Sequence, residues 1–201
     1  MKITLAKTAG FCFGVNRAVQ MVYDLLDDGK KVCTLGPIIH NSQMVGQLAD
    51  KGVRVVNSPF DVNPDETLVI RSHGVGKKVY DDAQKTGVKV SDATCPFVSK
   101  IHKIVEDQSK QGDTILIAGD KNHHEVIGIT GHCVSDFYVF ESTEELENLI
   151  EIHPELKKKP VSVVSQTTFN AKKWNIAQIF LKKVCTNAKI FDTICNATWA
   201  R

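Results

Sequence analysis

The stretch Val90-Ser91-Asp92-Ala93-Thr94-Cys95-Pro96 has the pattern of a short strand that leads into a cysteine and then into a helix. The residue before a proline is biased away from the helical region of backbone space, whereas proline itself suits the first turn of a helix. Cys95 is therefore expected at a strand-to-helix turn, where α/β proteins place their binding and catalytic groups.

The same pattern returns later in the chain. Lys89-Val90-Ser91-Asp92-Ala93-Thr94-Cys95 and Lys189-Ile190-Phe191-Asp192-Thr193-Ile194-Cys195 share lysine, a β-branched residue, aspartate and cysteine in register, 100 residues apart. A looser third copy opens the chain, with an expected strand at Ile3-Thr4-Leu5 that is followed by Cys12 and a helix. The repeat predicts one cysteine per unit, each at the same kind of turn.

Strand and helix patterns alternate between these cysteines, which predicts an α/β fold with mostly parallel sheets. The intervals from Cys12 to Cys95 and from Cys95 to Cys195 have the same order of elements. We therefore expect a first α/β repeat at residues 1–95, a second at 96–195, and the start of a third at 196–201.

Composition places the chain among ordinary globular proteins. It has 201 residues, of which 42% are hydrophobic, and this is enough for a real core. The net charge of +2 gives no argument for nucleic-acid binding. No apolar run approaches the ~20 residues of a membrane span, and Lys7 and Arg17 interrupt any secretory signal. We expect a cytoplasmic protein with no membrane or nucleic-acid partner.

The six cysteines are expected as thiols or metal ligands, because cysteines in the cytoplasm stay reduced. Their spacing contains no C-x-x-C pair, so any metal site must be assembled from distant turns. Three thiolates suit a cubane iron–sulfur cluster with one iron left without a protein ligand. Cys12, Cys95 and Cys195 are the candidate ligands; the alternative is that they are small thiols that pack in turns. That alternative is preferred for the cysteines inside strand or helix patterns, Cys33, Cys133 and Cys185.

Three histidines, His40, His73 and His123, follow strand ends at the edge that would carry the cysteines. Together they would surround an anion, with helix N-termini adding donors, although any one of them alone is more often a capping or packing residue. Thr167 and Thr168 would contribute hydroxyls at the corresponding turn of the second repeat.

Glu125 lies two residues after His123 and is a candidate proton donor. The alternative is an acid in the first turn of a helix, where a negative charge favours the helix dipole. A zinc hydrolase that uses His123, His124 and Glu125 is a rival interpretation of the same residues.

Seven motifs, in this order, closely resemble the LytB family of iron–sulfur reductases. They are Ala9-Gly10-Phe11-Cys12-Phe13-Gly14-Val15, Gly36-Pro37-Ile38-Ile39-His40-Asn41, Ser72-His73-Gly74-Val75, Asp92-Ala93-Thr94-Cys95-Pro96, His123-His124-Glu125, Gln166-Thr167-Thr168 and Cys195-Asn196-Ala197-Thr198.

The resemblance implies reductive dehydroxylation of 4-hydroxy-3-methylbut-2-enyl diphosphate to isopentenyl and dimethylallyl diphosphate, in the methylerythritol phosphate pathway. It implies a trefoil-like arrangement of three α/β repeats around a central iron–sulfur site, of which this chain contains two. The implied electron donor is a ferredoxin or flavodoxin. The implied site residues are Cys12, Cys95 and Cys195 for a [4Fe–4S] cluster, His40, His73, His123 and Thr168 for the substrate, and Glu125 with Thr167 for proton delivery.

The chain departs from the family pattern in two ways. His124 stands where the family commonly has proline. The family also continues for a further third of its length, and Arg201 matches the start of the helix after the third cysteine. We expect the 201 residues alone to be catalytically poor or inactive even if a cluster assembles. A non-catalytic iron–sulfur sensor or scaffold is the other interpretation that these residues allow.

Overall fold

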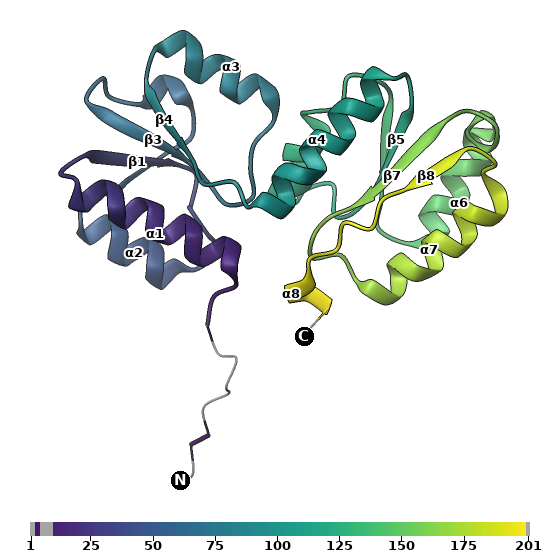
Figure 1. Ribbon diagram of the computed structural model, residues 1–201, viewed down its shortest axis with the longest axis horizontal. Coiled ribbons are helices and arrows are strands. Elements are labelled where there is room, and N and C mark those ends of the chain that lie inside the picture. The colour runs from purple at the N-terminus through teal and green to yellow at the C-terminus, as the bar shows by residue number, and fades with distance from the viewer. Residues whose placement is uncertain (1–2, 5–9, 200–201) are drawn as a thin grey trace. The chain divides into compact units, whose positions relative to one another are not determined.

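The computed structural model describes residues 3–4 and 10–199 of the chain. The chain divides into two compact units, which are seen in Figure 1. The first unit comprises Met1–Ser72 and Val88–Cys95, and the second comprises His73–Gly87 and Pro96–Arg201. Within the described residues, each unit contains one four-stranded sheet.

The sheet of the first unit is parallel throughout. Its strands are β1 (Lys31–Leu35), β2 (Arg54–Val56), β3 (Glu66–Ile70) and β4 (Lys89–Asp92), hydrogen-bonded in the order β2-β1-β3-β4. The register pairs Leu35 with Ile70 and Ile70 with Asp92, so these strands end level with one another. Because parallel strands present their carboxyl ends at one edge, the turns after β1, β3 and β4 lie together there.

Two helices cover one face of this sheet (Figure 1). The helices of the first unit are α1 (Phe13–Asp27), α2 (Ser42–Asp50) and the 3-10 helix η1 (Pro59–Asp61). Ala18 and Val22 of α1 are four residues apart and fully buried, as one face of a helix requires. They form a cluster with Leu48 of α2, Val32 of β1 and Val69 of β3. This packing fixes the start of α1 against the sheet.

The second unit repeats the sheet with the same strand order. Its strands are β5 (Thr114–Ala118), β6 (Phe137–Phe140), β7 (Val161–Ser165) and β8 (Ala188–Ile190), in the order β6-β5-β7-β8. All three pairings are parallel, and Ala118 pairs with Ser165 at the carboxyl edge.

Helices cover both faces of the second sheet. From Pro96 onward the helices of this unit are α4 (Pro96–Lys110), α5 (His124–Thr130), α6 (Thr143–Ile152), the 3-10 helix η2 (Pro154–Lys157), α7 (Ala171–Val184) and the short α8 (Asn196–Trp199). Leu116 of β5 packs with α6 and α7, while its neighbours Ile115 and Ile117 pack with α4 and α5. Successive strand residues point to opposite faces, so this fully apolar strand supplies both cores.

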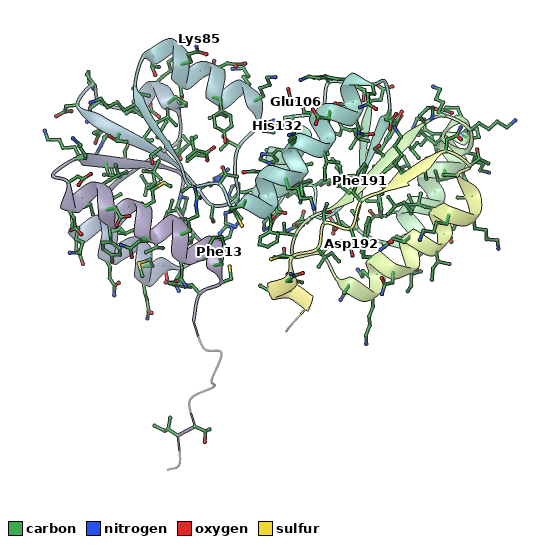
Figure 2. The ribbon with its side chains drawn as sticks, viewed as in Figure 1. Phe13, Lys85, Glu106, His132, Phe191 and Asp192 are labelled. Carbon is green, nitrogen blue, oxygen red and sulfur yellow. The ribbon has the colours of Figure 1, made fainter. Side chains whose placement is uncertain are left out.

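The segment before and including α3 (Lys77–Thr86) is attached to the second unit through glycine contacts. The Cβ that Gly131 lacks would stand 2.5 Å from the Gly76 Cα, so only glycine permits this approach. The Lys77 backbone N–H donates to the Gly131 carbonyl at 3.2 Å. A 2.7 Å ion pair joins Lys77 to Glu106 of α4, which is labelled in Figure 2.

A pair of stacked histidines, one of them buried, adds to this contact. The ring of His102 stacks on that of His132 with centroids 4.2 Å apart, and His132 Nε2 lies 3.0 Å from the Val75 carbonyl oxygen. Only 6% of His102 is exposed. The sequence pattern predicts ordinary surface or helix residues at these two positions. His102 is indeed a residue of helix α4, and it is buried there.

The predicted α/β fold with parallel sheets is confirmed. The apolar runs of the sequence predict strands at Lys31–Leu35, Thr114–Ala118 and Phe137–Phe140, and these are the observed bounds of β1, β5 and β6. For the expected strand Ile3-Thr4-Leu5, the first two residues have no regular secondary structure and Leu5 lies outside the described residues, as does Arg201. The repeat boundaries at 1–95, 96–195 and 196–201 stay a prediction. In the part of the chain that the structure describes, no helix is both long and apolar enough to cross a bilayer.

Candidate active site

Cys12 is the N-cap residue of α1. Its backbone is extended, with φ −69° and ψ 167°, and its side chain makes no capping hydrogen bond. The Cys12 carbonyl accepts the first helical hydrogen bond from the Asn16 N–H at 2.9 Å. The Cys12 thiol is half-buried and does not cap the helix, so it remains a candidate metal ligand.

Cys95 lies in the same unit and packs against the first turn of α1. A Cβ on Gly14 would stand 2.5 Å from the Cys95 Sγ, so the thiol occupies the space that a side chain would need. Arg17 of α1 donates to the Thr94 carbonyl at 3.1 Å, and the Cys95 N–H donates to the Ser72 carbonyl at 2.9 Å. Helix α1 therefore both begins at one candidate ligand and supports the other.

Cys195 is held in the second unit by the same backbone bond. Its N–H donates to the Thr167 carbonyl at 2.9 Å, as the N–H of Cys95 donates to that of Ser72. Ser72 and Thr167 each stand two residues after the end of a strand, β3 or β7. Thr198 of α8 also donates to the Thr167 carbonyl, from its hydroxyl at 3.0 Å. The two cysteines are equivalent positions of one repeated turn.

The remaining cysteines are poor candidates for thiolate chemistry. Burial raises the pKa of Cys33 to about 11 and that of Cys133 to about 12, and it also raises the pKa of Cys185. Because the thiolate is the metal ligand and the nucleophile, burial of this kind disfavours both roles.

Two of the three candidate histidines meet inside the second unit. The rings of His73 and His123 lie edge to face with centroids 5.6 Å apart. His123 is also the N-cap of α5, where its Nδ1 accepts the Glu125 N–H at 3.1 Å. A neutral ring that accepts at Nδ1 carries its proton on Nε2, so Nε2–H is a donor of the kind that an anion needs.

His40 belongs to the first unit and ends the turn after β1. It is exposed, and it precedes Asn41, whose side chain caps α2 by accepting the Met44 N–H at 2.9 Å. The turn is tied to the end of β3, because the Ser72 N–H and hydroxyl both lie 3.3 Å from the Ile38 carbonyl oxygen.

Glu125 is buried at the carboxyl edge of the second sheet and bound twice by Thr167. One carboxylate oxygen accepts the Thr167 backbone N–H at 2.6 Å, and the other accepts its hydroxyl at 2.7 Å. Only 2% of Glu125 is exposed. Burial raises the pKa of this carboxyl, and the two hydrogen bonds act in the opposite direction. An acid whose pKa is raised in this way keeps its proton to a higher pH than an exposed glutamate and suits proton donation.

Thr168 follows Thr167 and is exposed at this edge. Its hydroxyl accepts from the Gln166 side-chain amide at 3.0 Å, and the Gln166 amide oxygen accepts the Asp120 N–H at 3.3 Å. The predicted pair Thr167 and Thr168 thus divides into one hydroxyl that binds Glu125 and one that faces outward.

Sequence reasoning missed three residues that shape these turns. Gly14 was quoted within a motif but given no role, although glycine in the first turn of a long helix is a signal of close packing. Arg17 was considered only as a charge that interrupts a secretory signal, and Arg71 was given no role. A charged residue directly after the apolar strand β3 was the available signal for Arg71.

Comparisons with known proteins agree on one family. The family model described as LytB protein matches residues 3–201. A protein of Caldanaerobacter subterraneus subsp. tengcongensis named 4-hydroxy-3-methylbut-2-enyl diphosphate reductase is 45% identical over 205 residues, covering 100% of this chain and 69% of the relative. A reductase of the same name from Clostridioides difficile is 38% identical over 202 residues, covering 100% of this chain and 71% of the relative.

Two solved structures match as well. The structure of (E)-4-hydroxy-3-methyl-but-2-enyl diphosphate reductase, described as the terminal enzyme of the non-mevalonate pathway, has a TM-score of 0.83 and 36% identity, covering 99% of this chain and 70% of its own. The reductase from Plasmodium falciparum has a TM-score of 0.86 and 27% identity, covering 96% of this chain and 60% of its own. The motifs, the fold and these matches place the chain in the LytB family.

Proposed function

We propose that the protein reductively removes the allylic hydroxyl of 4-hydroxy-3-methylbut-2-enyl diphosphate and releases isopentenyl and dimethylallyl diphosphates. The reaction breaks one C–O bond, consumes two electrons and two protons, and releases water. The observation that carries the proposal is the buried Glu125 carboxyl bound by Thr167, in a chain of a family whose curated relatives have this name. Such a group supplies the protons that the reaction consumes.

Cys12, Cys95 and Cys195 would hold a [4Fe–4S] cluster. The donor set fits, because all three thiols are half-buried, each stands directly before a helix, and the thiol of Cys12 is not used as a cap. Iron–sulfur clusters are bound by thiolates, and three of them leave one iron without a protein ligand. When bound, the cluster supplies electrons and a Lewis-acidic iron.

His40, His73, His123 and Thr168 would bind the diphosphate. In the second unit, His73 and His123 already lie together, and the capping bond of His123 leaves its proton on Nε2. Imidazole N–H and hydroxyl groups are donors that phosphoryl oxygens accept, and charge on the acceptor strengthens each bond. The role of these residues is to hold the substrate, not to transfer its protons.

Glu125 would deliver protons, with Thr167 positioning the carboxyl. The two hydrogen bonds from Thr167 fix both oxygens, and burial keeps the carboxyl protonated to a higher pH than an exposed glutamate. The electrons would come from a small acidic carrier, a ferredoxin or flavodoxin.

The capping hydrogen bond of His123 counts against a zinc hydrolase. The Nδ1 atom of His123 is used to cap α5. A neutral imidazole that accepts at Nδ1 carries its proton on Nε2, so the capping ring offers no lone pair to zinc.

Anaerobic purification, followed by iron and sulfide analysis and a reductase assay, tests the proposal. We expect about four irons and four acid-labile sulfides per chain, and oxidation of a chemical reductant that depends on added allylic diphosphate. Zinc without sulfide would support the hydrolase instead. A cluster without affinity for allylic diphosphates would support a sensor or scaffold.

A further inference from the structure

Arg71 is a half-buried cation at the carboxyl edge of the first sheet. It directly follows β3, and its Nη1 lies 2.7 Å from the position that a Cβ on Gly36 would take. Gly36 has a φ of +68°, which glycine adopts at little cost. The glycine therefore gives the turn after β1 its shape and also leaves room for the guanidinium.

The charge of Arg71 is not compensated within the first unit. Its Nε is buried without a hydrogen-bond partner among the described residues. Burial lowers the pKa of Arg71, and no neighbouring charge acts in the other direction. The other arginines of this unit are bound: Arg54 donates to both carboxylate oxygens of Glu66, at 2.8 and 3.0 Å, and Arg17 donates to the Thr94 carbonyl.

The second unit shows that the fold does not need a cation at this position. Gln166 stands one residue after β7, as Arg71 stands one residue after β3, and it packs against the position of a Cβ on Gly119. The amide of Gln166 is neutral, and it is satisfied inside its own unit by the Asp120 N–H and the Thr168 hydroxyl. A shorter, neutral polar side chain therefore fills this place without leaving a charge unmatched.

A half-buried guanidinium without a counter-charge is unfavourable, and binding of an anion offsets that cost. Guanidinium binds phosphoryl oxygens with two parallel N–H donors. Arg71 stands beside the turn that ends at His40, because the Ser72 N–H lies 3.3 Å from the Ile38 carbonyl oxygen in that turn. We propose that Arg71 binds a phosphoryl group of the diphosphate substrate, from the edge of the first sheet beside the His40 turn. The inference rests on the proposed function.

The test replaces Arg71 with the residue that the second unit uses. In Arg71→Gln, we expect the Kd for inorganic diphosphate and the KM for the allylic diphosphate to rise about 10- to 100-fold, as loss of a charge-assisted hydrogen bond predicts, while kcat changes less than about threefold. Arg71→Lys should restore part of the affinity, because it restores the charge but not the two-donor geometry. Lys89→Gln, at the amino end of β4 and exposed, is the control for lost charge and should leave Kd and KM unchanged.

Thermal unfolding without diphosphate separates binding from a structural role. Removing an uncompensated buried charge should leave the midpoint unchanged or raise it, whereas loss of a structural contact would lower it. A lowered midpoint or failure to fold in Arg71→Gln, or unchanged Kd and KM, would overturn the inference and leave the function intact. If the wild-type protein neither binds diphosphate nor reduces the substrate, the proposed function fails, and the inference fails with it.

Discussion

The carboxyl edges of the two sheets share a backbone frame but hold different side chains. After β1 and β5, the Gly36 and Gly119 N–H groups donate to Val56 and Phe140 carbonyls, at 2.8 and 2.9 Å. After β4 and β8, a cysteine N–H donates to the carbonyl two residues past the central strand, at 2.9 Å in both units. The backbone hydrogen bonds that hold a cysteine at the sheet edge are therefore the same in both units.

The differences lie in charge. The first edge carries the unmatched cation Arg71, where the second has the satisfied amide of Gln166. The second edge carries the buried acid Glu125 at the start of α5, where the first has Ser42 at the start of α2. The edge of the first sheet thus carries a cation suited to binding an anion, Arg71, and the edge of the second carries an acid suited to donating a proton, Glu125.

The largest expected effect comes from the thiols that the frame repeats. Cys12→Ser, Cys95→Ser and Cys195→Ser should each abolish cluster binding, because a hydroxyl is a far weaker ligand of iron than a thiolate. Cys133→Ser is the matched control, since burial raises the pKa of Cys133 to about 12. Iron and sulfide analysis after anaerobic reconstitution measures the outcome. A wild-type iron content in Cys95→Ser would show that Cys95 is not a ligand and that the two cysteines are not functionally equivalent.

The next largest effect concerns the acid that only the second edge has. Glu125→Gln keeps the shape but removes the proton, so we expect turnover to fall about 100-fold or more while KM changes little. The exposed Glu145→Gln, on α6, is the control and should keep full activity. Wild-type turnover in Glu125→Gln would remove this carboxyl from the mechanism.

The same acid makes stability depend on pH in a defined direction. Burial raises the folded-state pKa of Glu125 above the value of 4.5 expected when unfolded. Between these two pKa values the folded state keeps a proton that the unfolded chain releases, so this contribution is full below pH 4.5 and is lost as pH rises through the folded pKa. Urea unfolding at pH 4.5 and pH 8 should therefore show wild type losing stability relative to Glu125→Gln. A constant difference would show that folding does not raise the pKa of Glu125.

Much of the backbone structure at the sheet edges could be predicted from sequence, because it depends on local sequence patterns. Apolar strands, each followed by a turn and an amphipathic helix, predicted the parallel sheets, and the pair Cys95-Pro96 predicted the start of α4. The register of Asp92 with Asp192 and of Cys95 with Cys195 identified the repeat. These features depend on backbone preferences that neighbouring residues determine.

What escaped prediction depends on contacts between residues far apart in sequence. The contact of Gly14 with Cys95 and the stacking of His102 on His132 are visible only in the folded structure, because nothing in the sequence near these residues indicates which residue each one contacts. Arg71 escaped for a related reason. The partial burial of Arg71 without a counter-charge arises only in the folded protein, whereas an arginine in an exposed turn would be an ordinary solvated cation.

A smaller effect is expected from the glycine that supports Cys95. Gly14→Ala would place a Cβ 2.5 Å from the Cys95 Sγ, so the thiol or the helix must shift. We expect the apoprotein to lose about 1–3 kcal/mol of stability and the reconstituted protein to hold less iron. Gly46→Ala in α2 is the control, because apart from its chain neighbours and its own helix backbone no described atom stands within 4 Å of its Cβ position, and there alanine should stabilise. Equal effects of the two changes would show that the first turn of α1 does not position Cys95.

The smallest expected effect comes from replacing Thr193 with alanine, the residue that the first unit has at the equivalent position. It tests whether the backbone of the second unit can form the hydrogen bond seen in the first. Thr193 binds the end of β7 through its hydroxyl, which lies 2.8 Å from both the Ser165 N and the Ser165 O atoms. The equivalent residue in the first unit is Ala93, whose own N–H donates to the Ile70 carbonyl at 3.1 Å. Thr193→Ala leaves a buried N–H and carbonyl without their hydroxyl partner, which should cost about 1–2 kcal/mol in urea unfolding.

Thr186→Ala, which removes an exposed hydroxyl bonded to the Lys157 carbonyl, is the control and should cost less than about 0.5 kcal/mol. A cost for Thr193→Ala as small as that of the control would mean that the backbone at residue 193 relaxes and its N–H takes over the Ser165 carbonyl, as Ala93 does with Ile70. The two edges would then differ only in side chains. The full cost would instead mean that the second unit needs this hydroxyl to hold the segment that leads to Cys195, so that its frame diverged from the first at the backbone as well.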